Sequence, residues 1–566
     1  MQTKKTSASF KCVLCAAMAA IALVGTMPAG QTAEDNPVLR IGLFYNTTAL
    51  PTANLENHTG SGYRFGYLQD GRSFVGIGET TETKITMVKN RNVYMKSGVY
   101  YDDSPPTGSM TIGCYHVDVG VSLSSFSEAQ GRAADLCGQG YEAFPVYDSG
   151  HYRVRIGAYT SAAAAGAAPA AGLPGAQVVT GSAYCVSVVR TETGTMVFQF
   201  DGGASVSLAI HPSLRDTPAP ITWFKGYRYC GGFEYRRTTG NNMTVVNWVT
   251  TQDYVKGVIP YEMNPAWPLE ALKAQAICAK SYAATNLSKH REYGFDLCST
   301  TDCQVYHGTG SASANSDRAV DETMGYYVYH GSKMASTVYH SSNGGSTESA
   351  VNVWGTDVAY LRAVPDNFED LSRAVNGIWS FTYTNADITQ ILRDKGYSTG
   401  AIVDAYVDEY TPAGNVYRVT FVDALGKKHN FERERARTVL NSSALNLHTH
   451  SQRYTISSGT ATLTVIGGAG NRVTKSSIGG LYAVGRDGVA PLSGSLSGLL
   501  LRAKSGLSSL PSVSTGQYLI SGRGWGHNVG MSQYGAKGMA EQGYRFEDII
   551  TYYFQNAEVR REGSAS

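Results

Sequence analysis

The chain has 566 residues, a formal net charge of +2 and only 16% charged residues, while hydrophobic residues make up 42%. This length suffices for two or three domains, so a single compact domain is not expected. No basic run is visible that could neutralise several phosphates, which excludes nucleic acid as an expected partner. The 63 glycines and 37 tyrosines instead suit an uncharged ligand that is rich in hydroxyl groups.

The N-terminus has the order of a secretory signal. Three lysines precede an apolar run from Cys12 to Gly25, and small residues follow up to Ala33. We therefore predict a signal peptide over residues 1–33. Because the run is short for a membrane span, an uncleaved signal that anchors the protein is the alternative. Either way, we expect a secreted or extracytoplasmic protein.

Residues 38–107 contain short segments in which apolar and polar residues alternate, such as VLRIGLFY and TKITMVK, with Gly, Asn and Asp between them. These are strand and turn signals. Similar strands return from residue 218 onward, as in FKGYRYCGGFEYRR. We predict one mostly β domain, made of residues 38–107 and 218–560, with a smaller domain inserted.

The predicted insert, residues 108–203, contains a near-repeat of a short strand, a Ser/Thr turn and an Ala-rich helical stretch. This order predicts a small βαβα domain. The pattern Tyr-x-Val-x-Val/Ile-Gly, at Tyr115 to Gly120 and at Tyr152 to Gly157, resembles the SPOR fold. That resemblance implies binding to glycan strands from which amidases have removed the peptides. The alternative is a small packing module without a ligand.

Residues 251–287 are the stretch around which we expect the main domain to be organised. Pro268 suits a first helical position, and apolar residues then recur at steps of three and four. They are Leu269, Leu272, Ala276, Ala279 and Ala283. We therefore predict a loop that carries Glu262, followed by a helix with one buried face.

Glu262 lies between Tyr261 and Met263, with Trp267 nearby in the sequence. An apolar wall would raise the pKa of this carboxyl and keep a proton available near neutrality, whereas a nearby helix start would lower it. The sequence does not fix the sign of the net shift. The alternative interpretation is an exposed loop glutamate without a special role.

Seven cysteines remain if the signal is removed, and an odd number leaves at least one unpaired. Cys278 is the expected unpaired residue, because it lies in the alanine-rich helix, where a thiol packs as a small hydrophobic group. Cys298 and Cys303 flank a short turn and could form a local disulfide.

Two glycine-bearing segments are candidates for ligand binding. In the first, HSSNGGSTE, paired glycines permit a close backbone approach and polar side chains suit hydroxyl and N-acetyl groups. Its candidate residues are Ser342, Asn343, Gly344 and Gly345. The alternative is a polar hairpin turn.

The second segment, SGRGWGHNVGMSQYG, begins as a strand and turns helical at about Ser532. Its candidate residues are Trp525, His527, Gln533 and Tyr534. We expect His527 to position the substrate or a loop, because a single histidine is more often a hydrogen-bonded structural group. No second histidine at helical spacing supports a metal site here.

Two of these stretches resemble one family. GVIPYEMNPAWPLEALKAQAICAKSYA and SGRGWGHNVGMSQYGAKGMAEQGYRFEDIITYYF are similar to the stage II sporulation protein D family, which includes the amidase-enhancer proteins. The departures are Asn264, Asn528 and the pair Lys280-Ser281. The resemblance implies a lytic transglycosylase that cuts peptidoglycan glycan strands, with Glu262 as the acid and base.

Some members of this family hold a zinc ion with cysteines and histidines near Cys298 and Cys303. In this sequence Asp302 stands where a histidine ligand would be expected, and His290 is the nearest upstream candidate. A structural zinc site needs four nitrogen or sulfur ligands. We therefore favour a disulfide or free thiols, and we assign no metal and no cofactor.

Together these observations predict an α+β protein with a mostly β catalytic domain around a buried helix and a SPOR-like insert. The expected partners are peptidoglycan glycan strands and a cell-wall amidase. Two rival interpretations remain open. The first is a non-enzymatic glycan-binding amidase enhancer. The second is a hydrolase that uses Glu348 or Asp357 as a second carboxylate.

Overall fold

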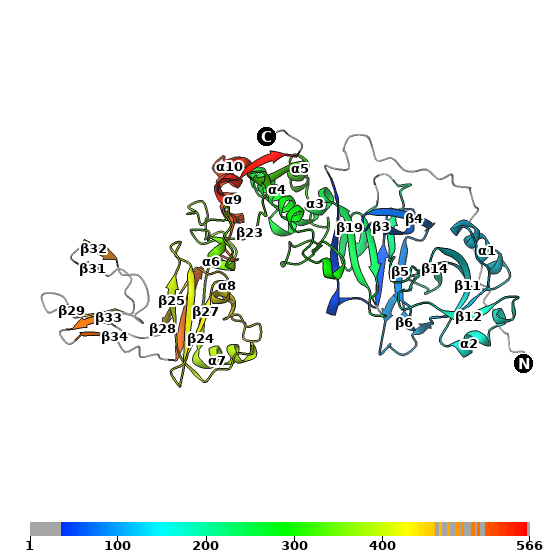
Figure 1. Ribbon diagram of the computed structural model, residues 1–566, viewed down its shortest axis with the longest axis horizontal. Helices are drawn as coiled ribbons and strands as arrows, with labels where there is room; N and C mark the ends of the chain where they lie inside the picture. The colour runs from blue at the N-terminus through cyan, green and yellow to red at the C-terminus, as the bar shows by residue number, and fades with distance from the viewer. Residues whose placement is uncertain are drawn as a thin grey trace, which may run out of the picture. The chain divides into compact units, whose positions relative to one another are not determined.

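The computed structural model describes residues 36–458 except 217, 219 and 239, six four-residue strands between residues 463 and 509, and residues 516–562. The predicted signal peptide, residues 1–33, lies outside these residues. The chain divides into two compact units (Figure 1). The first contains residues 1–265 and 286–325, and the second contains residues 266–285 and 326–566. Both mix helices with a larger number of strands, as predicted for an α+β protein.

The first unit contains a seven-stranded sheet in the order β20-β1-β19-β18-β15-β3-β4. Its strands are β1 Val38–Phe44, β3 Tyr63–Gln69, β4 Ser73–Thr80, β15 Leu208–Pro212, β18 Gly232–Arg236, β19 Thr244–Thr250 and β20 Leu297–Cys298. In β1 the buried residues Leu39 and Ile41 alternate with half-buried ones, which explains the alternation in this part of the sequence. The central strands β18 and β19 are buried along nearly their whole length. Strands from both sides of the insert therefore lie in one sheet.

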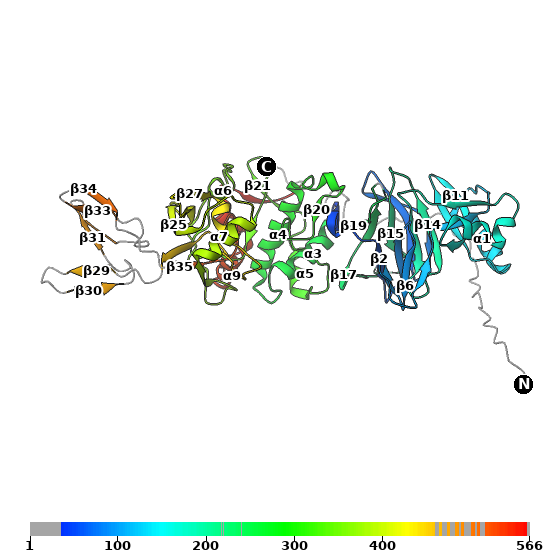
Figure 2. The same ribbon diagram turned by 90° about the horizontal axis from the view of Figure 1, so that it is seen from below.

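The second sheet of this unit has ten strands in the order β12-β9-β11-β10-β14-β13-β5-β2-β16-β17. They are β2 Thr52–Glu56, β5 Lys84–Lys89, β9 Tyr115–Asp118, β10 Ala143–Asp148, β11 His151–Tyr159, β12 Gln177–Thr180, β13 Val186–Arg190, β14 Met196–Asp201, β16 Thr222–Phe224 and β17 Tyr227–Tyr229. Phe65 of the first sheet stacks on Phe198 of the second, with centroids 4.8 Å apart. Figure 2 shows strands of both sheets, among them β15 of the first and β14 of the second. Three short strands, β6 Val93–Lys96, β7 Val99–Tyr101 and β8 Met110–Ile112, form a further small sheet.

The predicted insert contains more strands than the near-repeat indicated. Between β8 and β13 the order is β9, α1 (Phe126–Gly138), β10, β11, α2 (Ala162–Gly166) and β12, so β10 and β12 are additions to the expected βαβα pattern there. Ser125 and Ser161 cap the two helices through their side chains, as the Ser/Thr turns predicted. Beyond β12, the strand β13 pairs with β5, so this part of residues 108–203 continues the surrounding sheet.

The second unit contains α4, Leu269–Thr285, the helix that the apolar spacing predicted. Leu272, Ala276, Ala279 and Ala283 are buried, and Cys278 is a buried free thiol. Helices α9 (Gln533–Glu541) and α10 (Phe546–Tyr553) and strand β21 (Tyr326–His330) pack against α4. The small alanine side chains allow this close approach from several sides.

The other elements of the second unit are short helices and strands, and the strands pair in small sheets. They are β22 Lys333–Met334, β23 Tyr339–His340, α6 Ala350–Trp354, β24 Ile378–Thr384, α7 Asn385–Asp394, β25 Ile402–Tyr410, β26 Val416–Asp423, β27 Lys428–Glu432, α8 Glu434–Thr438, β28 Tyr454–Ser458, β35 Gln517–Arg523, β36 Met531–Ser532 and β37 Glu558–Arg561. Three further antiparallel pairs lie between β28 and β35. They are β29 Leu463–Ile466 with β30 Arg472–Lys475, β31 Tyr482–Gly485 with β32 Gly488–Pro491, and β33 Leu500–Ala503 with β34 Gly506–Ser509.

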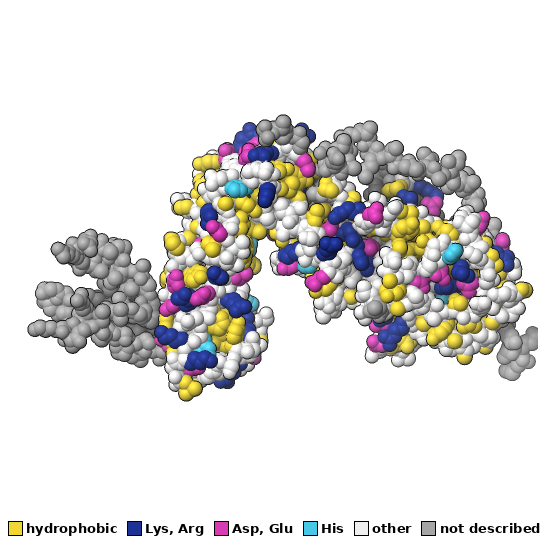
Figure 3. Space-filling view, in the orientation of Figure 1, with side chains coloured by type: hydrophobic (Ala, Val, Ile, Leu, Met, Phe, Trp, Pro, Cys, Tyr) yellow, Lys and Arg dark blue, Asp and Glu magenta, His cyan; other side chains and the backbone are white. Residues whose placement is uncertain are grey.

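Two further properties of the described residues concern the hydropathy of their helices and the charge of their surface. None of their helices is both long and apolar enough to cross a membrane. On the face shown in Figure 3, acidic and basic side chains are interspersed among many uncharged ones, in keeping with the low content of charged residues.

Arg155 links four strands of the SPOR-like region. It is 4% exposed and donates to Asp118 (3.4 Å), Asp148 (3.2 Å) and Gln199. We expect Arg155→Met to destabilise β9–β11 by about 3–5 kcal/mol, because the buried Asp118 carboxylate loses its buried ionic partner and keeps only the longer, partly exposed contact with Arg153. Amide hydrogen exchange of β9–β11 in the full chain measures this loss.

Arg153 provides the matched control, since it faces the same two carboxylates at 3.9 and 3.8 Å with a side chain that is 33% exposed. Arg153→Met should cost at most about 1 kcal/mol, because solvent screens the pair. Equal losses in the two variants would contradict the role assigned to Arg155.

Candidate functional site

Glu262 is the last residue of α3, Thr251–Glu262, and the sequence-based prediction of a loop was wrong. Gly257 and Pro260 both lie within this helix, and Pro260 is accommodated in its last turn. The helix begins with the cap of Thr250, whose side chain accepts from the Asp253 N–H. This Thr-x-x-Asp spacing was the signal that could have predicted α3.

The Glu262 side chain is half-buried and accepts a hydrogen bond of 2.8 Å from the Val305 N–H. The residues on either side of Val305 are anchored in the first unit. Gln304 donates to the Tyr254 hydroxyl of α3 at 3.1 Å, and the Tyr306 hydroxyl donates to Asn247 of β19 at 2.6 Å. The position of this carboxylate is therefore set by a held backbone segment.

Three aromatic rings form a cluster that includes Tyr261, the residue before Glu262. Tyr227 stacks on His307 with centroids 4.4 Å apart and planes 8° apart, and Tyr261 meets His307 edge-on at 5.1 Å. Tyr227 is 38% exposed. Burial lowers the pKa of His307, which keeps the ring neutral. The cluster offers an uncharged aromatic surface, a type that packs against the C–H faces of sugars.

All seven cysteines of the described residues are free thiols, so the disulfide considered for Cys298 and Cys303 is absent from this structure. Instead, these two thiols, His290 and Asp302 present ligand atoms that lie within 4.8 Å of one another. The hydrogen bond with Cys303 lowers the pKa of Cys298 to about 5 and raises that of Cys303.

The spacing of these four groups fits a tetrahedral zinc ion. Zn–N and Zn–S bonds of about 2.0–2.3 Å place tetrahedral ligands roughly 3.3–3.8 Å apart. The separations are 3.3 Å from Cys303 Sγ to His290 Nε2, 3.2 Å from His290 Nε2 to Asp302 Oδ2, and 3.8 Å from Cys298 Sγ to Asp302 Oδ2. Asp302 thus presents an oxygen where the sequence comparison expected a histidine.

The two glycine-bearing segments lie together in the second unit, joined by backbone hydrogen bonds. β23 pairs in parallel with β36, and Ser342 and Trp525 exchange N–H···O bonds of 3.1 and 2.8 Å. The Asn528 amide also donates to the Asn343 carbonyl at 3.3 Å. Many of the glycines serve this close packing, since a Cβ at Gly524 would lie 2.6 Å from the Ser342 oxygen.

The predicted binding residues differ in exposure. Ser342, Asn343, Gly344 and Gln533 are buried, whereas Gly345, His527 and Tyr534 are half-buried and Trp525 is 40% exposed. Burial lowers the pKa of His527 well below its usual value, and its Nδ1 accepts the Val529 N–H at 3.1 Å. His527 is therefore a neutral, hydrogen-bonded group, as expected for a positioning residue.

Glu369, which no sequence motif indicated, holds the Asn-Gly-Gly turn from within. It accepts the N–H groups of Asn343 and Gly344 at 2.7 and 2.8 Å, and the Ser532 hydroxyl. Burial, with a contribution from the Asp366 charge, raises the pKa of Glu369 to about 7. These backbone donors, which a ligand could have used, are thus occupied by a side chain of the same chain.

Neither proposed second carboxylate is placed to activate water. Glu348 is 1% exposed, and its oxygens accept from Asn352, Thr411 and Asn415 at 2.9, 2.6 and 2.9 Å. Asp357 is exposed and pairs with Arg362 at 2.6 Å. The geometry of both residues therefore weakens the hydrolase interpretation.

Comparisons with known proteins agree with both resemblances. The family model described as Stage II sporulation protein matches residues 239–330, and the SPOR domain model matches residues 113–179. An uncharacterized protein of Brachyspira hyodysenteriae is 42% identical over 125 residues, which are 22% of this chain and 34% of that protein.

Two relatives from Bacillus match longer stretches. The amidase enhancer of Bacillus subtilis is 29% identical over 324 residues, 53% of this chain and 39% of the relative. The stage II sporulation protein D of Bacillus amyloliquefaciens is 23% identical over 417 residues, 68% of this chain and 95% of the relative. The chain spans between a third and two fifths of the first two relatives. It thus carries a stage II sporulation protein D segment, which includes Glu262, and a SPOR domain, and both resemblances are confirmed.

Proposed function

We propose that this protein is a secreted lytic transglycosylase that cleaves peptidoglycan glycan strands. It cuts the bond from N-acetylmuramic acid to N-acetylglucosamine in peptide-free strands and leaves 1,6-anhydro ends. The catalytic domain comprises residues 38–107 and 218–560 around the buried helix α4, with a SPOR-like glycan-binding domain at residues 108–203. The observation that carries the proposal is the half-buried Glu262 carboxylate, held by the Val305 N–H within the matched family segment.

In this proposal Glu262 acts twice. As an acid it protonates the oxygen of the scissile bond, while positive charge builds on the muramic ring. As a carboxylate it then takes the proton from the 6-hydroxyl of that ring, which closes the anhydro bridge. One carboxyl suffices because the nucleophile is internal, whereas hydrolysis usually needs a second carboxylate.

The aromatic cluster of Tyr227, His307 and Tyr261 would support a sugar ring near Glu262. The other binding residues proposed are Ser342, Asn343, Gly344, Gly345, Trp525, His527, Gln533 and Tyr534. Ser342, Asn343, Gly344 and Gln533 are buried, so in this proposal they hold the conformation of the two glycine-bearing segments. Trp525 and Tyr534 are more exposed and would contact the glycan directly.

The zinc-like arrangement would have a structural role. His290, Cys298, Asp302 and Cys303 would hold the ion with all four positions filled, which leaves none open for a substrate. Such an ion would fix the segment that leads from β20 to Val305, the partner of Glu262.

A second candidate function is that of a glycan-binding protein which enhances a cell-wall amidase without cutting strands. The printed name of the Bacillus subtilis relative, Amidase enhancer, favours it. The two candidates share the glycan ligand and differ in whether Glu262 is needed.

We expect Glu262→Gln to lower strand cleavage by at least about a hundredfold while folding and glycan binding are kept, since the amide has a similar shape but donates no acid proton. Mass spectrometry of digested strands measures cleavage and separates anhydro ends from reducing ends. The control is Glu292→Gln, a change at an exposed acid of the same unit. Unchanged turnover by the Glu262 variant would overturn the assignment.

Tyr227→Ala should raise KM for soluble glycan fragments roughly threefold to tenfold with little change in kcat, because stacking binds substrate and transition state alike. Tyr227→Phe keeps the ring and should behave like the wild type. Steady-state kinetics separate the two parameters, and a loss confined to kcat would argue against a stacking role.

The protein purified with zinc should contain about one ion per chain, and Cys303→Ser should lose it, because a hydroxyl is a poor zinc ligand. Elemental analysis measures the content, and a lowered Tm after chelation gives a second readout. The control Cys114→Ser should retain the metal. Equal zinc content in all three proteins would refute the site.

A further inference from the structure

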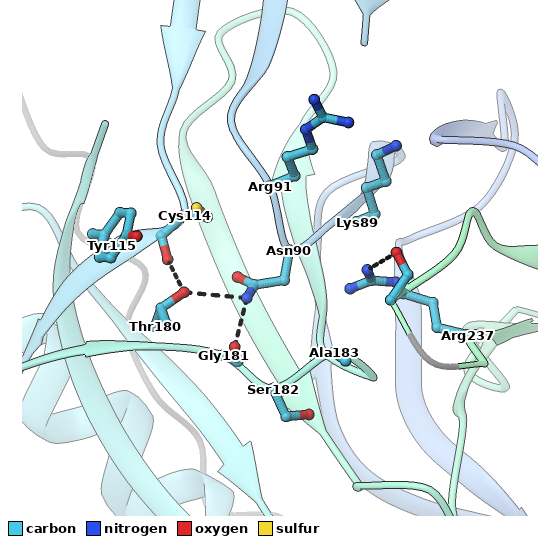
Figure 4. Close-up of a pocket in the computed structure, with 11 residues that line it drawn as sticks. Lys89, Asn90, Arg91, Cys114, Tyr115, Thr180, Gly181, Ser182, Ala183 and Arg237 are labelled. Atoms are coloured by element: carbon cyan, nitrogen blue, oxygen red, sulfur yellow. Dashed lines mark hydrogen bonds between the residues drawn. The ribbon is translucent and has the colours of Figure 1, made fainter. Parts of the chain in front are cut away.

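A polar pocket of about 360 Å³ lies within the first unit, where the SPOR strands meet the strands around them (Figure 4). Its walls come from the end of β5, the start of β9, the end of β12 and the turn after β18. Three of its eleven lining residues, Lys89, Arg91 and Arg237, are basic and none is acidic. Lys89 pairs with Asp102 at 2.7 Å, and the exposed Arg91 faces Asp103 at 3.9 Å, a pair that solvent screens. The excess positive charge of the lining attracts anions.

Arg237 is the lining residue best suited to bind an anion. It is 7% exposed, and its guanidinium donates to the carbonyls of Cys185, Gly240 and Asn241 at 2.6, 3.0 and 3.0 Å. It forms no salt bridge with any residue in the described part of the chain, and two of its five N–H donors bond none of these residues. Burial lowers its pKa, with only weaker opposing effects from Cys185 and Asp201.

Other buried cations of the same unit are neutralised by contact. Arg155 is 4% exposed and pairs with Asp118, and Lys89 is 6% exposed and pairs with Asp102 at 2.7 Å. Buried charges are normally paired in this way, because leaving water is costly for an ion. Arg237 is buried but has no acidic partner among the described residues, and it lines the pocket.

The wall opposite Arg237 is held in place before any ligand arrives. The Asn90 amide donates to the Gly181 carbonyl at 2.7 Å and to the Thr180 hydroxyl at 3.2 Å, and Thr180 donates to the Cys114 carbonyl at 2.8 Å. Figure 4 shows Thr180 and Arg237 on opposite sides of Asn90. A pocket with fixed walls loses little entropy when it binds.

We propose that this pocket binds the carboxylate of an N-acetylated sugar acid, with Arg237 and Arg91 as the cationic partners. Its volume is at the lower end of the range of small-ligand sites, about 300–1,000 Å³, which suits a single sugar. The choice of sugar rests on the proposed function. A muramic residue without its peptide carries a free lactyl carboxylate, whereas a peptide-bearing one carries a neutral amide at that position. This site therefore binds the sugar only after the peptide has been removed.

The test uses the full chain with Glu262→Gln, which binds without turnover, and calorimetric titration with monosaccharides. We expect N-acetylmuramic acid to bind at least about tenfold more tightly than its methyl ester or N-acetylglucosamine, because only the free acid offers the charge-assisted bonds. Arg91→Glu, at an exposed position, and Arg237→Gln should each abolish this preference. Arg132→Glu, at an exposed arginine of α1 outside the pocket, should preserve it.

Equal affinity for the acid and the ester would overturn the proposal, as would equal losses in the Arg91 and Arg132 variants. Inorganic phosphate that competes as strongly as the sugar acid would reduce the site to a general anion site and also overturn it. Preferential binding of the acid by a protein whose wild type cleaves no strands would uphold the pocket while refuting the transglycosylase.

Discussion

The hydrogen bond from the Val305 N–H to Glu262 is the constraint on which the proposed site depends. A glutamate at the end of a helix has several rotatable bonds, and a misplacement of about 1 Å can cost a hundredfold in rate. The main-chain donor removes this freedom only if its own segment is fixed. Gln304 and Tyr306 supply that condition by bonding to α3 and β19, the two elements that lead to Glu262.

In the second unit, buried carboxylates fix the conformation of backbone segments. Glu369 and Glu348 lie inside the two glycine-bearing segments, and each is surrounded by amide, hydroxyl or backbone donors. Buried charges of this kind are costly unless every lone pair is satisfied, and breaking such a network destabilises the local fold strongly. These bonds hold the two segments in one backbone conformation, whereas their glycines alone would allow many.

Much of the fold followed from local patterns. Alternation over Val38–Phe44 reflects one buried sheet face, and the steps of three and four from Leu269 onward reflect the buried helix α4. The Ser/Thr turns at Ser125 and Ser161 cap helices because their hydroxyls accept nearby N–H groups. In α3, however, the structure forms a helix where a loop was predicted, and it accommodates both Gly257 and Pro260.

The sequence by itself determined the residue types at the candidate site, the two family resemblances and the helix α4, because these depend on neighbours along the chain. Only the tertiary structure decided which groups meet. Val305 reaches Glu262 across 43 positions, Glu369 reaches Asn343 across 26, and His290 joins Asp302 and the two thiols through a folded turn. Whether Ser342 or Trp525 faces solvent was likewise decided by packing, since a polar or aromatic side chain suits a buried, hydrogen-bonded place as well as a surface.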